Sequence, residues 1–153
     1  MAKKIKIQLD FAEDNSLIGV SCHKRDYWFA YHLNETLRIK LRRLKDFPFF
    51  QSRLDELVEY PIFHDFSPDD QVGYYLISNF NEQSLLFPEM KAADFFLLVQ
   101  GRPTETRKTE ILSRIRGING VLTAFFPDTR KLKEFENFLS DLELHMTGLK
   151  VRD

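Results

Sequence analysis

The chain has 153 residues, and its 22 lysine and arginine residues against 23 aspartate and glutamate residues give a net charge of −1 at pH 7. This length is typical of one domain, expected here over residues 1–153, and the balanced charge argues against nucleic acid or an anionic membrane surface as the partner. The single cysteine excludes an internal disulfide, and no apolar run resembles a signal peptide or a membrane span, so we expect a cytoplasmic protein.

The first part of the chain is predicted to form two strands and one helix. Residues 5–11 alternate between apolar and polar side chains, and this pattern predicts a half-buried strand. Residues 17–20 predict a second strand, which Gly19 weakens. Between residues 24 and 37 the apolar residues recur at helical spacing, which predicts a helix. The buried face of this helix is expected to consist of Phe29, Ala30, Leu33 and Leu37.

Three further strands are predicted before the middle of the chain. Residues 38–44 alternate again, with arginine and lysine on one side. Residues 58–66 read as an extended segment, and Pro61 within it favours a position at the edge of the sheet. Residues 74–78 are its expected partner strand. The phenylalanine-rich residues 47–50 have no clear pattern.

Residues 95–99 are the most hydrophobic run of the chain, with five apolar residues before Gln100 and Gly101. A run of this kind is typical of a strand buried on both faces, so we expect it at the centre of the sheet. A helix with Pro103 near its start is predicted to follow. Its apolar stripe is Ile111, Leu112, Ile115 and Ile118.

The chain is predicted to end with a strand over residues 121–126 and a helix capped by residues 127–129, ahead of a polar tail after Gly148. The stripe of this helix is Leu132, Phe135, Phe138, Leu139 and Leu142. Together these elements predict one α+β domain, a mostly antiparallel sheet with about three helices. Its C-terminal half, read as strand, helix, strand and helix, is similar to a ferredoxin-like or ACT-like half.

Residues 87–95 read FPEMKAADF, and this segment resembles the signature of the IPExxxVDY family of small bacterial proteins. Pro88, Glu89 and Asp94 match the family pattern. The departures from the pattern are Phe87, Ala93 and Phe95. Residues 17–23 and 74–79 are also similar to the family. Because the family has no assigned activity, the resemblance implies no mechanism, and Phe95 lacks the tyrosine hydroxyl of the signature.

The signature residues Pro88, Glu89, Asp94 and Phe95 form the first candidate site. Two carboxylates beside a bend can act as general acid and base when their environments separate their pKa values. Alternatively, Pro88 fixes the bend, Glu89 accepts from loose backbone N–H groups, and Asp94 anchors the buried strand. We favour this structural interpretation, because the entrance of a buried strand needs satisfied polar groups.

The start of the helix after residue 100 is the second candidate site. It would bind a small anionic ligand, as in an ACT-like sensor, through free N–H groups and nearby cations. The residues concerned are Gly101, Arg102, Thr104, Arg107 and Lys108. The alternative is a glycine turn, a threonine cap and an exposed basic helix face. This alternative is favoured, because most helix N-termini bind only water and their own caps.

Other reactive residues give weaker signals. Cys22 and His23 are adjacent, but neighbours in a strand point to opposite faces and cannot form a thiol–imidazole pair. The four histidines lack metal-ligand spacing, so neither a metal nor a cofactor is predicted. The basic residues within 38–45 and the phenylalanines that follow could suit single-stranded nucleic acid. The acidic residues from 55 to 70 oppose this, and a solvated face is favoured.

The sequence therefore predicts a non-catalytic cytoplasmic module for protein interaction or regulation, with a protein partner or a second copy of the chain as its ligand. Phe47, Phe49 and Phe50 would supply the apolar contact, unless they belong to the ordinary core. The anionic-ligand sensor is the second hypothesis. An enzyme that uses Glu89 and Asp94 is the third.

Overall fold

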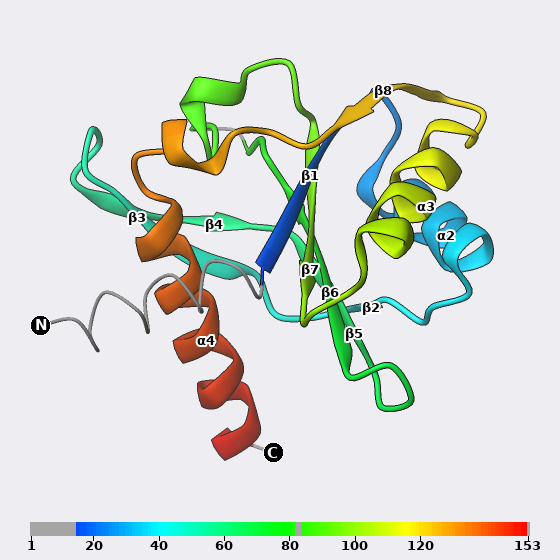
Figure 1. Cartoon of the computed structure of the whole chain (residues 1–153). Helices are drawn as coiled ribbons and strands as arrows, with labels where there is room; N and C mark the ends of the chain where they lie inside the picture. The colour runs from blue at the N-terminus through cyan, green and yellow to red at the C-terminus, as the bar shows by residue number, and fades with distance from the viewer. Residues whose placement is uncertain (1–14, 82–83, 153) are drawn as a thin grey trace, which may run out of the picture.

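The computed structural model describes residues 15–81 and 84–152, and in this part of the chain six antiparallel strands form one sheet (Figure 1). Their order is β2-β5-β6-β7-β1-β8. The strands of this sheet are β1 (Asn15–Cys22), β2 (Arg42–Arg43), β5 (Ile62–Ser67), β6 (Val72–Ser78), β7 (Phe95–Gln100) and β8 (Val121–Phe125). A separate two-stranded ribbon consists of β3 (Phe47–Gln51) and β4 (Glu56–Tyr60). The strand predicted over residues 5–11 lies outside the described residues.

Within the described part of the chain, three α-helices cover the two faces of the sheet. Helices α2 (Asp26–Leu37) and α3 (Glu105–Arg116) lie on one face, whereas α4 (Phe135–Arg152) and the β3–β4 ribbon lie on the other (Figure 1). The described residues also contain two short 3₁₀ turns, η1 (Pro88–Met90) and η2 (Thr129–Lys131). The prediction of one α+β domain with a mostly antiparallel sheet and about three helices is confirmed.

Strand β7 lies inside the sheet, between β6 and β1, as its apolar run predicts. Its side chains alternate between the two faces: Phe95, Leu97 and Val99 contact the core under α2 and α3, and Phe96 and Leu98 contact the core under α4. Each core has a helical cover, so both faces of this strand exclude water. That is why the segment carries no polar residue before Gln100.

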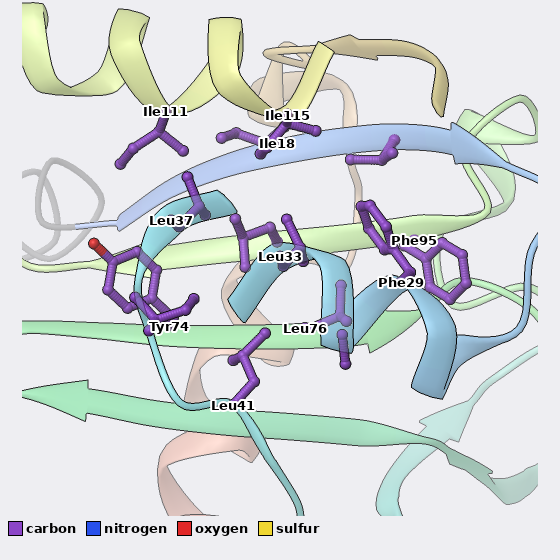
Figure 2. Packing of buried hydrophobic residues seen from close by; sticks show 14 of the residues in the cluster. Ile18, Phe29, Leu33, Leu37, Leu41, Tyr74, Leu76, Phe95, Ile111 and Ile115 are labelled. Atoms are coloured by element: carbon purple, nitrogen blue, oxygen red, sulfur yellow. The ribbon is translucent and has the colours of Figure 1, made fainter. Parts of the chain in front are cut away.

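The predicted helix stripes build the core on the first face. Phe29 and Leu33 of α2 point onto the sheet, and Ile111 and Ile115 of α3 lie beside them (Figure 2). The rings of Phe29 and Phe95 are 5.0 Å apart between centroids. Burying each such side chain stabilises the fold by about 1.5–3 kcal/mol, so this packing fixes where both helices sit on the sheet.

Strands β7 and β8 run in the same direction, because each is antiparallel to β1, which lies between them. Helix α3 connects them, so this part of the chain is a split β-α-β unit. The similarity to a ferredoxin-like half is limited to this unit. Helix α4 then crosses to the opposite face of the sheet, where it packs against β3.

The predicted boundaries differ from the structure at three places. Of residues 38–44, only Arg42 and Arg43 pair as a strand, although Ile39 and Leu41, on the apolar side of the alternating pattern, are buried. Residues 58–66 were expected to form one edge strand; Pro61 instead divides them into β4 of the ribbon and β5, which lies inside the sheet. The chain changes sheets at this proline because it has no N–H for a ladder. Helix α4 begins at Phe135, after the η2 turn, rather than at the predicted cap of residues 127–129, and it continues through Gly148.

Candidate functional site

The signature segment is held in place by Asn79, a buried residue just after β6. Its side-chain Nδ2 donates to the carbonyl oxygens of Met90 at 3.0 Å and Ala93 at 2.8 Å. Its Oδ1 accepts from the backbone N–H of Phe87 at 2.9 Å. One side chain thus pairs three backbone groups of a bend that lacks regular secondary-structure partners, and it uses both of its amide hydrogens.

Asp94 joins this bend to β1. Its Oδ2 accepts from the backbone N–H of Cys22 at 2.8 Å, and its own N–H donates to the carbonyl of Val20 at 2.8 Å. The pairing of β1 with β7 ends at Val20 and Phe95, so the next N–H of β1 on that side has no strand partner. The carboxylate supplies the missing acceptor, which is the anchoring role expected for this residue.

Glu89 has a different position from Asp94. It is exposed in the η1 turn that begins at Pro88, where the N–H of Met90 bonds to the carbonyl of Phe87. Within the described residues, no hydrogen bond or ion pair of Glu89 is formed, either with Asp94 or with the turn. The structural role expected for Glu89 is therefore wrong in its detail, and the two carboxylates do not form a hydrogen-bonded acid–base pair.

Cys22 and His23 point to different surroundings. The Cys22 thiol is buried in the core under α2 and α3, and this burial, with a smaller contribution from Asp94, raises its pKa. The His23 side chain is 76% exposed, and its Nε2 lies 3.8 Å from Oδ2 of Asp94. A thiol–imidazole pair is not formed. In the part of the chain that the structure describes, no three histidine, cysteine or acidic residues could hold a metal ion.

The predicted anion site at the start of α3 is occupied by the chain's own groups. Thr104 caps the helix, with its Oγ1 accepting from the N–H of Arg107 at 3.1 Å. Lys108 pairs with Glu105 at 3.1 Å, and Arg107 pairs with Glu110 at 3.4 Å. These contacts match the alternative of a threonine cap and a charged helix face.

The other two residues of this predicted site lie before the cap. Arg102 is exposed in the loop between β7 and α3. Gly101 has a φ of 138°, and a Cβ there would lie 2.9 Å from the carbonyl oxygen of Gln71. Glycine is therefore needed for close packing of two backbones, which explains its presence without any ligand.

The three phenylalanines of β3 divide between core and surface. Phe47 and Phe49 are buried under α4, whereas Phe50 is 47% exposed on the outer side of the ribbon. Leu57 lies directly opposite Phe50 on β4 and is 63% exposed, and Leu54, in the connecting turn, is 42% exposed. We call these three exposed residues, Phe50, Leu54 and Leu57, the ribbon patch.

Acidic side chains flank the ribbon patch along the chain: Asp55 lies in the same turn as Leu54, and Glu59 lies two residues after Leu57 on the same face of β4. Asp55, Glu56 and Glu59 are all exposed on the same turn and strand. Sequence reasoning singled out the phenylalanines but missed Leu54 and Leu57. The alternation of β4 was the available signal: Val58 and Tyr60 are buried, so Leu57 must point outward.

The basic run of residues 38–45 lies mainly at the edge of the sheet. Arg42 and Arg43 form β2, and both are exposed. The backbone N–H of Lys40 donates to Asp65 at 3.0 Å, so part of the acidic block does face the basic one. Charged side chains on an edge strand deter pairing with another chain.

Among residues 15–81 and 84–152, no helix is both long and apolar enough to cross a membrane. The sequence matched neither the protein-family models nor the curated proteins with which it was compared. The resemblance to the IPExxxVDY signature consequently stays a prediction.

Proposed function

We propose that this chain is a non-catalytic protein-interaction module and that the ribbon patch is its contact surface. The observation that supports this proposal is the exposed pair of Phe50 and Leu57, which face each other across β3 and β4. Two large apolar side chains at directly opposite positions form a continuous surface, and Leu54 extends it. Contiguous exposed apolar residues of this kind are typical of protein-binding sites.

The ribbon holds this surface firmly. Phe49 and Val58, the neighbouring cross-strand pair, are buried on the inner side, where Phe49 packs near Phe138 of α4 with ring centroids 6.3 Å apart. An outer face on a ribbon anchored in this way loses little conformational freedom on binding. Fully burying Phe50 and Leu57 would contribute about 1.5–3 kcal/mol each, a size found for central contact residues.

The acidic rim indicates the chemistry of the partner. Asp55 and Glu59 would meet basic side chains beside an apolar centre, and such rim charges mainly raise the rate of association. The two other hypotheses have less support. Two cations of the predicted anion site, Arg107 and Lys108, pair with acidic residues of α3, and Asp94 is engaged by the backbone of β1.

The test compares the tagged wild-type chain with a Phe50→Ser, Leu57→Ser variant in pull-downs from the native cells. A Leu122→Ser variant is the matched control, because Leu122 of β8 is also 65% exposed. We expect a protein that binds the wild type and the control but not the ribbon variant, and that rebinds in purified form. A concentration-dependent dimer lost only in the ribbon variant would identify a second copy as the partner. Equal recovery with all three chains would contradict the proposal.

A further inference from the structure

Helix α2 carries a continuous aromatic surface on its outer side. Tyr27 and Tyr31 lie one turn apart and are 66% and 60% exposed. The ring of His32 lies edge-on to Tyr31, with centroids 5.4 Å apart, and 3.9 Å from the centroid of Trp28. We call these four residues, Tyr27, Trp28, Tyr31 and His32, the α2 patch. Aromatic side chains are enriched among the residues that dominate protein contacts, so this patch is suited to such a role.

The α2 patch is fixed to the rest of the fold. The Trp28 ring packs directly on the turn before β8, where a Cβ at Gly120 would lie only 2.8 Å from it. The Lys24 ammonium lies 5.4 Å from the centroid of the same ring. Tyrosine and tryptophan have only two side-chain dihedral angles, so ordering them on binding costs little entropy. The patch is therefore a prepared contact surface.

Positive charge predominates around the α2 patch. Lys24 and Arg25 precede α2 and Arg38 follows it, and all three are exposed. Within the described residues, none of these three cations forms an ion pair. The helix itself carries two carboxylates, Glu35 and Asp26, and Asp26 accepts from the next backbone N–H at 2.7 Å. Three cations thus stand against two carboxylates.

The ribbon patch has the opposite charge. Asp55 and Glu59 flank it, and neither forms an ion pair with another described residue. The nearby Arg53 is directed to Ser84, with its Nη2 donating to Oγ at 2.8 Å. The same chain therefore presents an apolar surface flanked by negative charge and an aromatic surface flanked by positive charge. Surfaces of this kind are electrostatically complementary.

The charges favour a head-to-tail contact over a symmetrical one. Two ribbon patches in contact would bring carboxylates together, two α2 patches would bring cations together, and like charges oppose association. The ribbon and α2 lie on opposite faces of the sheet, so one chain cannot join its own two patches (Figure 1). Resting on the ribbon patch as the contact surface, we propose that it binds the α2 patch of a second copy of this chain. Because each bound copy keeps one patch open, the contact repeats into a ring or an open chain.

Sedimentation equilibrium of the purified chain tests this contact. Each patch exposes only a few large side chains, so we expect a weak contact that forms at roughly 0.1–1 mM protein in low salt. The average mass of the wild type should rise with concentration, and about 0.5 M NaCl should reduce this rise, because salt screens the charges. Leu144→Ser is the matched control, because Leu144 is exposed on α4, outside both patches. A wild-type chain that stays monomeric at about 1 mM, or an association that salt does not weaken, overturns the proposal.

Two variants that each lack one patch identify the pairing. The ribbon variant is Phe50→Ser, Leu57→Ser, and the α2 variant is Tyr27→Ser, Tyr31→Ser. Each variant alone should stay monomeric. An equal mixture should form a 1:1 dimer and nothing larger, because each chain keeps the patch that the other lacks. A symmetrical dimer would survive in one of the two variants alone, and this result, or a mixture of folded variants that stays monomeric, rejects the head-to-tail contact.

The outcome can be separated from that of the proposed function. If the α2 variant does not unfold cooperatively, Lys24→Glu, Arg25→Glu replaces it, because both residues precede the helix. A monomeric wild type, together with a protein that only the ribbon variant fails to retain in pull-downs, would reject the second copy and keep the ribbon patch as the contact surface. Monomeric behaviour throughout, with equal recovery by all chains in the pull-downs, would reject both.

Discussion

Asn79 and Ala93 are joined by a hydrogen bond of 2.8 Å that runs from the asparagine amide to a main-chain carbonyl in the interior of the protein. The bond connects the end of β6 with the residue two before β7 and closes the bend that contains the signature. Buried polar groups are costly when unpaired, and Asn79 pairs backbone groups of the bend that would otherwise lack a partner. This asparagine therefore stabilises the bend more directly than Pro88 or Glu89.

Replacing Asn79 by alanine should lower the free energy of unfolding by about 3–5 kcal/mol, since it leaves the Ala93 carbonyl and the Phe87 N–H without partners and removes one of the two bonds to the Met90 carbonyl. Urea denaturation followed by circular dichroism measures this change. Asn137→Ala is the matched control, because Asn137 is exposed on α4 and should cost less than about 0.5 kcal/mol. Similar effects of the two substitutions would contradict the role of Asn79.

Asp94 can be tested by rescue with asparagine. Asp94→Ala removes the acceptor for the Cys22 N–H and should cost about 1–3 kcal/mol. Asp94→Asn keeps an oxygen at this place and should recover most of the loss in a thermal or urea unfolding measurement. If alanine and asparagine prove equally destabilising, the negative charge, rather than the acceptor, is what the fold requires.

The Cys22 thiol should make the stability fall at alkaline pH. Its pKa is raised in the folded chain by burial, so the unfolded chain loses the proton more readily. The stabilisation is complete below the unfolded thiol's pKa of about 8.5 and is lost as the pH rises through the folded value. Urea unfolding between pH 7 and 9.5 measures this slope, and Cys22→Ala should flatten it.

Two raised tyrosine pKa values complete the alkaline profile. Burial raises the pKa of both Tyr60 and Tyr75. A raised pKa in the folded chain again stabilises the fold at lower pH. The stabilisation from these two tyrosines is lost only above about pH 10, the ordinary pKa of tyrosine. A profile of the wild-type chain that stays level up to pH 9.5 would contradict the assignment to Cys22.

Two glycines should respond to alanine with opposite signs. Gly120 has a φ of 116°, and a Cβ there would lie 2.8 Å from the Trp28 ring, so Gly120→Ala should destabilise by about 1–3 kcal/mol. Gly148 lies in α4 with nothing within 4 Å of an added Cβ. Gly148→Ala should therefore stabilise by about 0.5–1 kcal/mol. Melting temperatures of the two variants that move in the same direction would refute this comparison.

Thr104 should act as a helix cap and as nothing more. Thr104→Ala should cost about 1 kcal/mol, and Thr104→Ser should restore it, because serine supplies the same hydroxyl acceptor to the Arg107 N–H. Inorganic phosphate should leave the melting temperature of all three chains unchanged apart from the general salt effect. A phosphate-dependent stabilisation that Thr104→Ala removes would revive the anion site.

The sequence alone determined the elements whose burial is periodic. The unbroken apolar run of β7 and the stripes of α2 and α3 predicted which side chains reach the core, because a strand or helix presents fixed faces to its neighbours. These patterns are local, and they predicted the α+β class.

The tertiary structure decided which distant groups meet. Asp94 reaches the N–H of Cys22 across 72 positions of the chain, and Pro61 divides one apparent strand between two sheets. Phe50 lies on the opposite face of the ribbon from Phe47 and Phe49. Which of these two faces is buried depends on the position of α4. Such relationships depend on the pairing and packing of remote segments, so the local spacing of residue types does not specify them.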